Sequence, residues 1–191
     1  SVDWMPTQVG DVTLRAFLDF ASDQVPVNNY TGFTSIHIYP EGTEELINEG
    51  FEDGELPTGW TQEYISGMHD WAYIDGGNAG NPANAHTGSF NAHLYGGATG
   101  YTTILVSPEI NIGMTDPAEL RFWHAQADSW GSQDILNVYY KTSPGGEWEL
   151  LESYTETVLV WEERVLELPN PATTYYIGFE GVISWGHGVC I

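Results

Sequence analysis

Hydrophobic and polar residues alternate along much of this chain, whereas the three-and-four spacing of an amphipathic helix is hard to find. Leu120, Phe122 and His124 would share one face of an extended segment, since neighbouring side chains of a strand point to opposite sides. Residues 135–140 alternate in the same way. A period of two is typical of β-strands, so the pattern predicts an all-β protein.

Candidate strands recur at the short intervals that are typical of β-sandwiches and barrels. The Ser-Pro-Gly-Gly sequence at residues 143–146 separates two of them and is a strong hairpin signal. The strands are expected at residues 46–52, 60–65, 71–75, 89–95, 101–106, 119–127, 134–142, 147–154, 158–168, 174–183 and 188–191.

The first 40 residues differ from the rest, because they hold only two candidate strands, at residues 12–20 and 34–39. So few strands cannot enclose a core of their own. We therefore expect residues 1–40 to be the C-terminal part of an upstream domain, or a strand pair that docks elsewhere. The polar residues 41–46 are interpreted as a linker, and residues 47–191 as the main domain.

The charge is strongly negative, with 27 acidic and 4 basic residues and a formal net charge of -23. Nucleic acids and anionic membrane surfaces need clustered lysine and arginine, so both are excluded as partners. No apolar run approaches the ~20 residues of a membrane span, so we expect no membrane insertion. Calcium is the ion that fits best, because oxygen-rich loops abound and Cys190 is the only thiol.

Several segments resemble, in order, the motifs of cleaved-adhesin (choice-of-anchor J) domains, which are similar in fold to MAM domains. The matching segments are Phe51-Glu-Asp-Gly-Glu-Leu-Pro-Thr-Gly-Trp60, His86-Thr-Gly-Ser-Phe90, Leu105-Val-Ser-Pro108, Leu120-Arg-Phe-Trp-His124 and Gly186-His-Gly-Val-Cys-Ile191. The resemblance covers residues 47–191 and implies an antiparallel jelly-roll β-sandwich at an extracellular or cell-surface location. Residues 1–40 resemble the end of a CARDB-like or other immunoglobulin-like domain, which implies an N-terminal immunoglobulin-like fragment.

The resemblance also implies a calcium site, formed by Glu52, Asp53 and the carbonyl region of Thr87. From the residues alone, Glu52, Asp53 and Glu55 form an acidic, glycine-containing loop that suits calcium or is simply solvated. In the family the closing strand continues with two aspartates, of which at least one usually helps to bind the metal. This sequence ends at Ile191, before them, and that departure counts against a family-type site.

No catalytic site is expected. The sequence has no Gly-x-Ser-x-Gly nucleophile elbow, and Cys190 lies in a predicted strand with few cationic neighbours to activate its thiol. Glu162 and Glu163 cannot act as a glycosidase pair, because adjacent residues of a strand face opposite sides.

The eight tryptophans fall into two groups. Trp60, Trp123 and Trp161 lie in predicted strands or at core positions of the family, and we expect them to pack. Trp130 and Trp185 lie in Gly/Ser-rich loops, where exposed aromatic rings can stack on sugars or anchor a protein partner. The alternative for these two is that their rings fold over the end of the sandwich.

Together these features predict an adhesion or ligand-binding module of a larger secreted or cell-surface protein, with a glycan or a host or matrix protein as its partner. Two alternatives stay open. One is a structural subunit of a filament or surface layer, in which residues 1–40 add a strand to a neighbouring subunit. The other is an accessory domain of a secreted protease or glycosidase.

Overall fold

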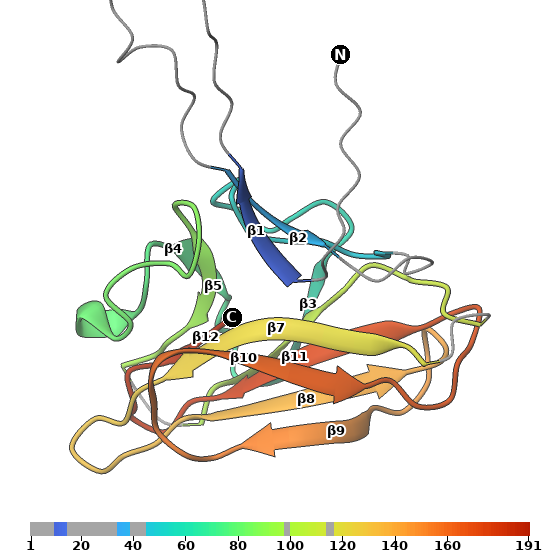
Figure 1. The fold of residues 1–191 in the computed structure, drawn as a ribbon. Coiled ribbons are helices and arrows are strands. Elements are labelled where there is room, and N and C mark those ends of the chain that lie inside the picture. The colour runs from blue at the N-terminus through green and yellow to red at the C-terminus, as the bar shows by residue number, and fades with distance from the viewer. Residues whose placement is uncertain (1–9, 15–33, 39–44, 98–99, 114–116) are drawn as a thin grey trace, which may run out of the picture. The chain divides into compact units, whose positions relative to one another are not determined.

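The computed structural model describes residues 10–14, 34–38, 45–97, 100–113 and 117–191. The chain forms two compact units, Ser1–Glu45 and Leu46–Ile191, which we describe separately. In the first, β1 (Gly10–Leu14) pairs antiparallel with β2 (Thr34–Ile38) (Figure 1). Most of residues 1–40, for which the immunoglobulin-like resemblance was given, lie outside the described residues, so that expectation stays a prediction.

The second unit consists of two five-stranded antiparallel sheets that face each other (Figure 1). Their strand orders are β10-β7-β12-β5-β4 and β3-β6-β11-β8-β9. The arrangement confirms the predicted antiparallel jelly-roll β-sandwich. The strands are β3 (Thr61–Ser66), β4 (Ala72–Ile74), β5 (Asn91–Leu94), β6 (Thr102–Val106), β7 (Glu119–Gln126), β8 (Ile135–Lys141), β9 (Glu149–Tyr154), β10 (Val158–Glu167), β11 (Tyr176–Val182) and β12 (Val189–Cys190), with one 3-10 turn at Asn78–Gly80.

The predicted strands from residue 60 onward are all present, most of them shortened at their ends. The strand predicted at residues 46–52 is wrong, because the chain turns there instead of extending. Phe51 has a φ of 61° and Gly54 a φ of 70°. The Gly54 N–H donates to the Phe51 carbonyl at 3.1 Å, which closes the turn. The Phe51 side chain therefore enters the core from a loop and not from a strand.

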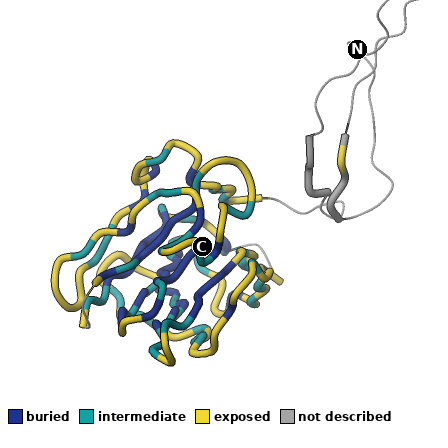
Figure 2. Tube along the Cα trace, turned by 90° about the vertical axis from the view of Figure 1, so that its left-hand side faces the viewer, coloured by how far each residue is buried: buried dark blue, intermediate teal, exposed yellow. Residues whose placement is uncertain are grey.

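The core lies between the two sheets, where the buried stretches of Figure 2 run. The predicted alternation along β8 is present, and its Leu136, Val138 and Tyr140 side chains are the ones that face inward. Phe122 of β7 meets Phe179 of β11 edge to face, with ring centroids 5.2 Å apart. Contacts of this kind hold the two sheets together through the burial of apolar surface.

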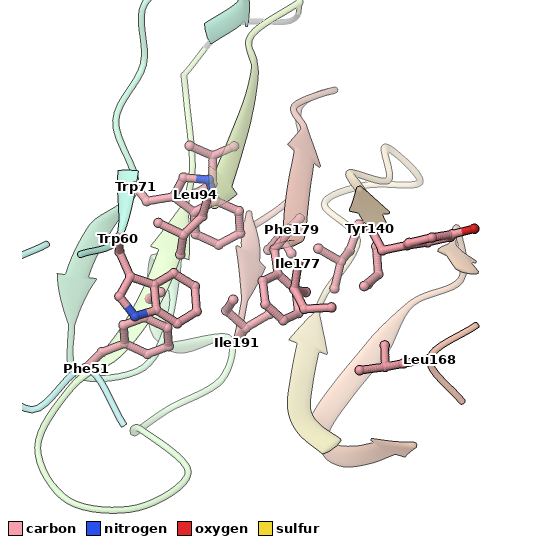
Figure 3. Close-up of a cluster of buried hydrophobic side chains, with 14 of the residues drawn as sticks. Phe51, Trp60, Trp71, Leu94, Tyr140, Leu168, Ile177, Phe179 and Ile191 are labelled. Carbon is pink, nitrogen blue, oxygen red and sulfur yellow. The ribbon is translucent and has the colours of Figure 1, made fainter. Parts of the chain in front are cut away.

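The opening segment packs its aromatic rings at one side of this core (Figure 3). The rings of Phe51 and Trp60 meet edge to face, with centroids 5.6 Å apart, and Phe51 also stacks on Tyr73 at 5.7 Å. Trp71 donates its indole N–H to the Thr103 carbonyl at 3.2 Å. Trp60 therefore packs in the core, as predicted.

The last strand, β12, lies at the centre of its sheet, between β5 and β7. Cys190 pairs with His93 on one side and with Ala125 on the other. Its side chain is fully buried, and this burial strongly raises the pKa of the thiol. The Cys190 thiol is thus a small core group and not a reactive nucleophile.

Candidate functional site

Trp130 stands at the tip of the loop between β7 and β8. Ser129 and Ser132 exchange two backbone hydrogen bonds of 2.9 Å, which leaves Trp130 and Gly131 as the two central residues of a tight turn. Both have positive φ, 53° and 83°. A bulky residue in this region costs about 1–3 kcal/mol. The Trp130 side chain is nevertheless fully exposed, at 103% of its reference area, so burial of the ring does not offset that cost.

Asp128 stabilises this turn through hydrogen bonds. Its Oδ2 accepts the Gly131 N–H at 3.1 Å, and its own N–H donates to Thr157 Oγ1, also at 3.1 Å. Thr157 lies in the loop that precedes β10, so the turn is attached to a neighbouring loop as well as to its own strands. The Trp130 ring is therefore presented on a hydrogen-bonded support.

Trp185 projects from the loop between β11 and β12, with a φ of 68° and 54% of its surface exposed. The fully buried carboxylate of Asp134 holds this loop in place. Asp134 Oδ1 accepts the backbone N–H groups of Ser184 at 2.5 Å and of Gly186 at 3.0 Å. Its Oδ2 accepts the N–H of Gly188 at 2.8 Å. Three charge-assisted hydrogen bonds thus set the backbone on both sides of Trp185.

The two tryptophan loops lie next to each other. The His187 N–H donates to the Ala127 carbonyl at 3.0 Å, which joins the loop of Trp185 to the start of the loop of Trp130. The side chain of Asn78, in the loop between β4 and β5, lies 3.2 Å from His187 Nδ1. The predicted pair of exposed tryptophans is therefore carried by adjoining loops at one end of the sandwich.

Asp134 is a site residue that the sequence analysis missed. A signal for it is nevertheless present in the sequence. The alternation that directs Leu136, Val138 and Tyr140 into the core places Asp134 on the same inward face. A carboxylate in line with a buried apolar stripe must find hydrogen-bond donors inside the protein, and here it finds the loop of Trp185.

The predicted packing residues Trp123 and Trp161 lie on the outer face of β7 and β10, not between the sheets. The His86 ring stacks on Trp123, with centroids 3.7 Å apart, and approaches Trp161 edge-on at 6.0 Å. The Trp161 indole N–H donates to the Asn84 carbonyl at 2.9 Å. These two tryptophans therefore hold the long loop between β4 and β5 against the sheet.

The predicted calcium ligands are only partly brought together. Glu52 reaches the segment that follows Thr87, but its carboxylate accepts the N–H of Ser89 at 2.9 Å and lies 3.5 Å from the N–H of Phe90. Asp53 and Thr87 are both exposed. The Glu52 carboxylate is therefore engaged by backbone N–H groups of this segment.

Within the described residues, no group of three or more histidine, cysteine, aspartate or glutamate side chains could hold a metal ion. As they lie, the residues around Glu52 do not fit a calcium ion. Calcium binding stays a prediction, and no step below depends on it. In the part of the chain that the structure describes, no helix is long and apolar enough to cross a membrane.

Comparisons with known proteins agree with this fold. The model of the Cleaved Adhesin Domain family matches residues 44–149. The K3 and K1 cleaved adhesin domains of Lys-gingipain from Porphyromonas gingivalis W83 are each 19% identical to the chain, with TM-scores of 0.56 and 0.54. Each alignment covers 77% of this chain, and 96% and 97% of those domains, respectively.

A third similar structure is TmCBM61 in complex with β-1,4-galactotriose, which is 17% identical, with a TM-score of 0.53. The match covers 74% of this chain and 88% of that one. At these identities the likeness shows the fold alone. No curated protein matches the chain.

Proposed function

Because this chain belongs to the Cleaved Adhesin Domain family, we propose that residues 46–191 form an extracellular adhesion module that binds carbohydrate through Trp130 and Trp185. The observation that carries the proposal is the state of Trp130, whose ring is fully exposed on a turn of positive φ. Neither packing nor backbone preference accounts for a tryptophan at this position. Contact with a ligand accounts for it.

The chemistry of the two rings suits sugars. A pyranose presents an apolar face of C–H groups, and an indole offers a broad apolar surface for it to stack on. The supports described above also favour binding. Because Asp128 and Asp134 hold the two turns before any ligand arrives, little conformational freedom remains to be lost on association.

The structural neighbours support the same class of function. Two of them are adhesin domains, and a third is a carbohydrate-binding module that was solved with a galactan trisaccharide. The rigid sandwich with functional loops at its end is also the usual way in which binding modules of this architecture are organised. The proposal assigns no catalytic step to this chain.

The test is a glycan array probed with the 191-residue chain, followed by calorimetry with the best ligand and with β-1,4-galactotriose as a first defined probe. We expect Trp130→Ala and Trp185→Ala each to weaken binding by at least about tenfold, the loss expected for an aromatic anchor. Met68→Ala is the matched control, because Met68 is also highly exposed, at 81%, but lies in the loop between β3 and β4. Wild-type affinity in both tryptophan variants would refute the proposal.

A further inference from the structure

The second sheet carries an open hollow on its outer face, away from the tryptophan loops. It has a volume of about 350 Å³ and is lined by residues from the ends of four strands and their turns. Lys141, the last residue of β8, and Tyr176, the first residue of β11, form part of its floor and pair in register. The loops of Trp130 and Trp185 lie beyond the opposite ends of these two strands. Seven residues of strand separate the two places by roughly 20 Å.

Lys141 is an unusual lining residue, because its side chain is only 7% exposed. Its Nζ lies 2.9 Å from Glu63 Oε1 and 4.1 Å from the centre of the Trp148 ring. An ammonium group carries three N–H donors. Among the described residues, Glu63 is the one hydrogen-bond acceptor found for the Lys141 Nζ. A buried cation at the wall of a hollow thus retains donor capacity for a ligand.

Two carboxylates face the same hollow. Glu63 accepts the Trp148 indole N–H on its Oε2 at 3.0 Å, and Glu109 accepts the Tyr176 hydroxyl on its Oε2 at 2.7 Å. Each carboxylate has about four lone-pair positions, so both can accept further hydrogen bonds. These internal contacts fix the position of each group before a ligand arrives, which lowers the entropic cost of binding.

The combination of groups identifies the ligand class. A sugar hydroxyl accepts one hydrogen bond and donates another, so it can accept from the Lys141 ammonium and donate to a carboxylate of the same hollow. The Tyr176 ring supplies apolar surface beside them. An anionic ligand would face two carboxylates and a protein of formal net charge -23, so a neutral ligand is favoured.

We propose that this hollow is a second carbohydrate subsite, selective for a neutral hexose ring over its uronic acid. The choice of carbohydrate as the ligand class rests on the function proposed above, but the residues of the two sites are separate. A volume of about 350 Å³ is near the lower end for small-molecule sites and suits a ligand of one or two rings.

The test titrates galactose, glucose and mannose, and the corresponding uronic acids, into the isotopically labelled chain and follows the backbone amide signals. We expect at least one neutral hexose to shift signals around Thr61 and Glu109, and the uronic acids to leave them in place. Glu109→Gln removes the charge, and Thr61→Phe fills the hollow from the exposed end of β3. Each should weaken this binding by at least about tenfold.

Glu167→Gln is the matched control, because Glu167 is an exposed carboxylate on the other sheet and should leave the titration unchanged. If Thr61→Phe and Glu109→Gln both bind as the wild type does, or if the uronic acids bind more tightly, the second subsite is refuted. The function proposed above survives that result if Trp130→Ala still abolishes binding on the array. The reverse pattern, with loss only in the hollow variants, refutes the tryptophan site and keeps this one. If no sugar binds to the wild-type chain, both are refuted.

Discussion

The buried carboxylate of Asp134 accepts the backbone N–H of Gly186, the residue directly after Trp185. The approach is so close that a side chain at position 186 would overlap the carboxylate. The buried Asp134 carboxylate therefore requires a glycine at position 186. Through this contact the interior of the sandwich sets the position of an exposed aromatic ring.

Asp134→Asn should destabilise the domain by about 2–4 kcal/mol, because its amide group turns an N–H donor toward backbone N–H groups in a buried place. Urea unfolding followed by circular dichroism measures the change. Asp128→Asn is the control, because Asp128 makes a similar contact to Gly131 in an exposed turn and should cost about 1 kcal/mol or less. Equal losses in the two variants would show that Asp134 is not a special support.

Trp130→Gly should abolish glycan binding without weakening the fold. Glycine adopts the φ of 53° freely, so the substitution relieves about 1 kcal/mol of backbone strain and removes a ring that is already in water. We expect the midpoint of thermal unfolding to stay unchanged or to rise slightly, whereas calorimetry should detect no ligand. A loss of more than about 1 kcal/mol of stability would mean that the ring packs inside the molecule.

The contribution of His124 to the stability of the domain should fall as the pH drops from about 6.5 to about 4. Burial, helped by the nearby Arg164 cation, lowers the pKa of His124 to about 4, so the folded state keeps this ring neutral. The unfolded chain, with an ordinary histidine pKa near 6.5, takes up a proton first in that range, which favours unfolding. The effect of His124 amounts to up to roughly 3 kcal/mol.

Unfolding free energies of the wild type and His124→Gln, measured between pH 4 and 7, isolate this contribution. The carboxylates titrate in both proteins. The difference between the two slopes of unfolding free energy against pH is therefore the contribution of His124. Burial also lowers the pKa of His93, and its slope remains in the variant. Parallel curves for the two proteins would contradict the prediction.

Glu52→Gln should cost about 1 kcal/mol in calcium-free buffer, because the carboxylate bonded to the Ser89 N–H loses its charge. Glu55→Gln, an exposed acid of the same turn, should have no effect. The same melts with and without millimolar calcium test the predicted ion. A calcium-dependent rise in melting temperature that Glu52→Gln abolishes would establish the site. If calcium leaves the melting temperature of the wild type unchanged, the predicted site is refuted.

Much of the sandwich could be predicted from the sequence, because inward and outward residues alternate on strands such as β8. The segment at residues 46–52 was mistaken for a strand because a pattern of apolar residues does not record the positive φ of Phe51. The sequence also singled out Trp130 and Trp185 by their Gly/Ser surroundings. It left their exposure open, since exposure depends on how neighbouring loops fold.

The hollow could not be predicted, for a different physical reason. Glu63, Glu109, Lys141 and Tyr176 are far apart along the chain and meet only because β3, β6, β11 and β8 are neighbours in one sheet. Nothing in the local sequence of any one of them indicates the others. Lys141 would be taken for an ordinary surface lysine at the end of a strand, although its side chain is almost fully buried.

The central place of β12 has a consequence for how the domain is made. Because β12 lies between β5 and β7, the halves β10-β7 and β5-β4 become one sheet only when residues 189–190 are in position. During synthesis, the chain up to and including β12 must therefore leave the ribosome before this sheet can assemble. Until then the edges of β5 and β7 that later pair with β12 remain unpaired. Loss of the β12 pairing would therefore divide this sheet between β7 and β5.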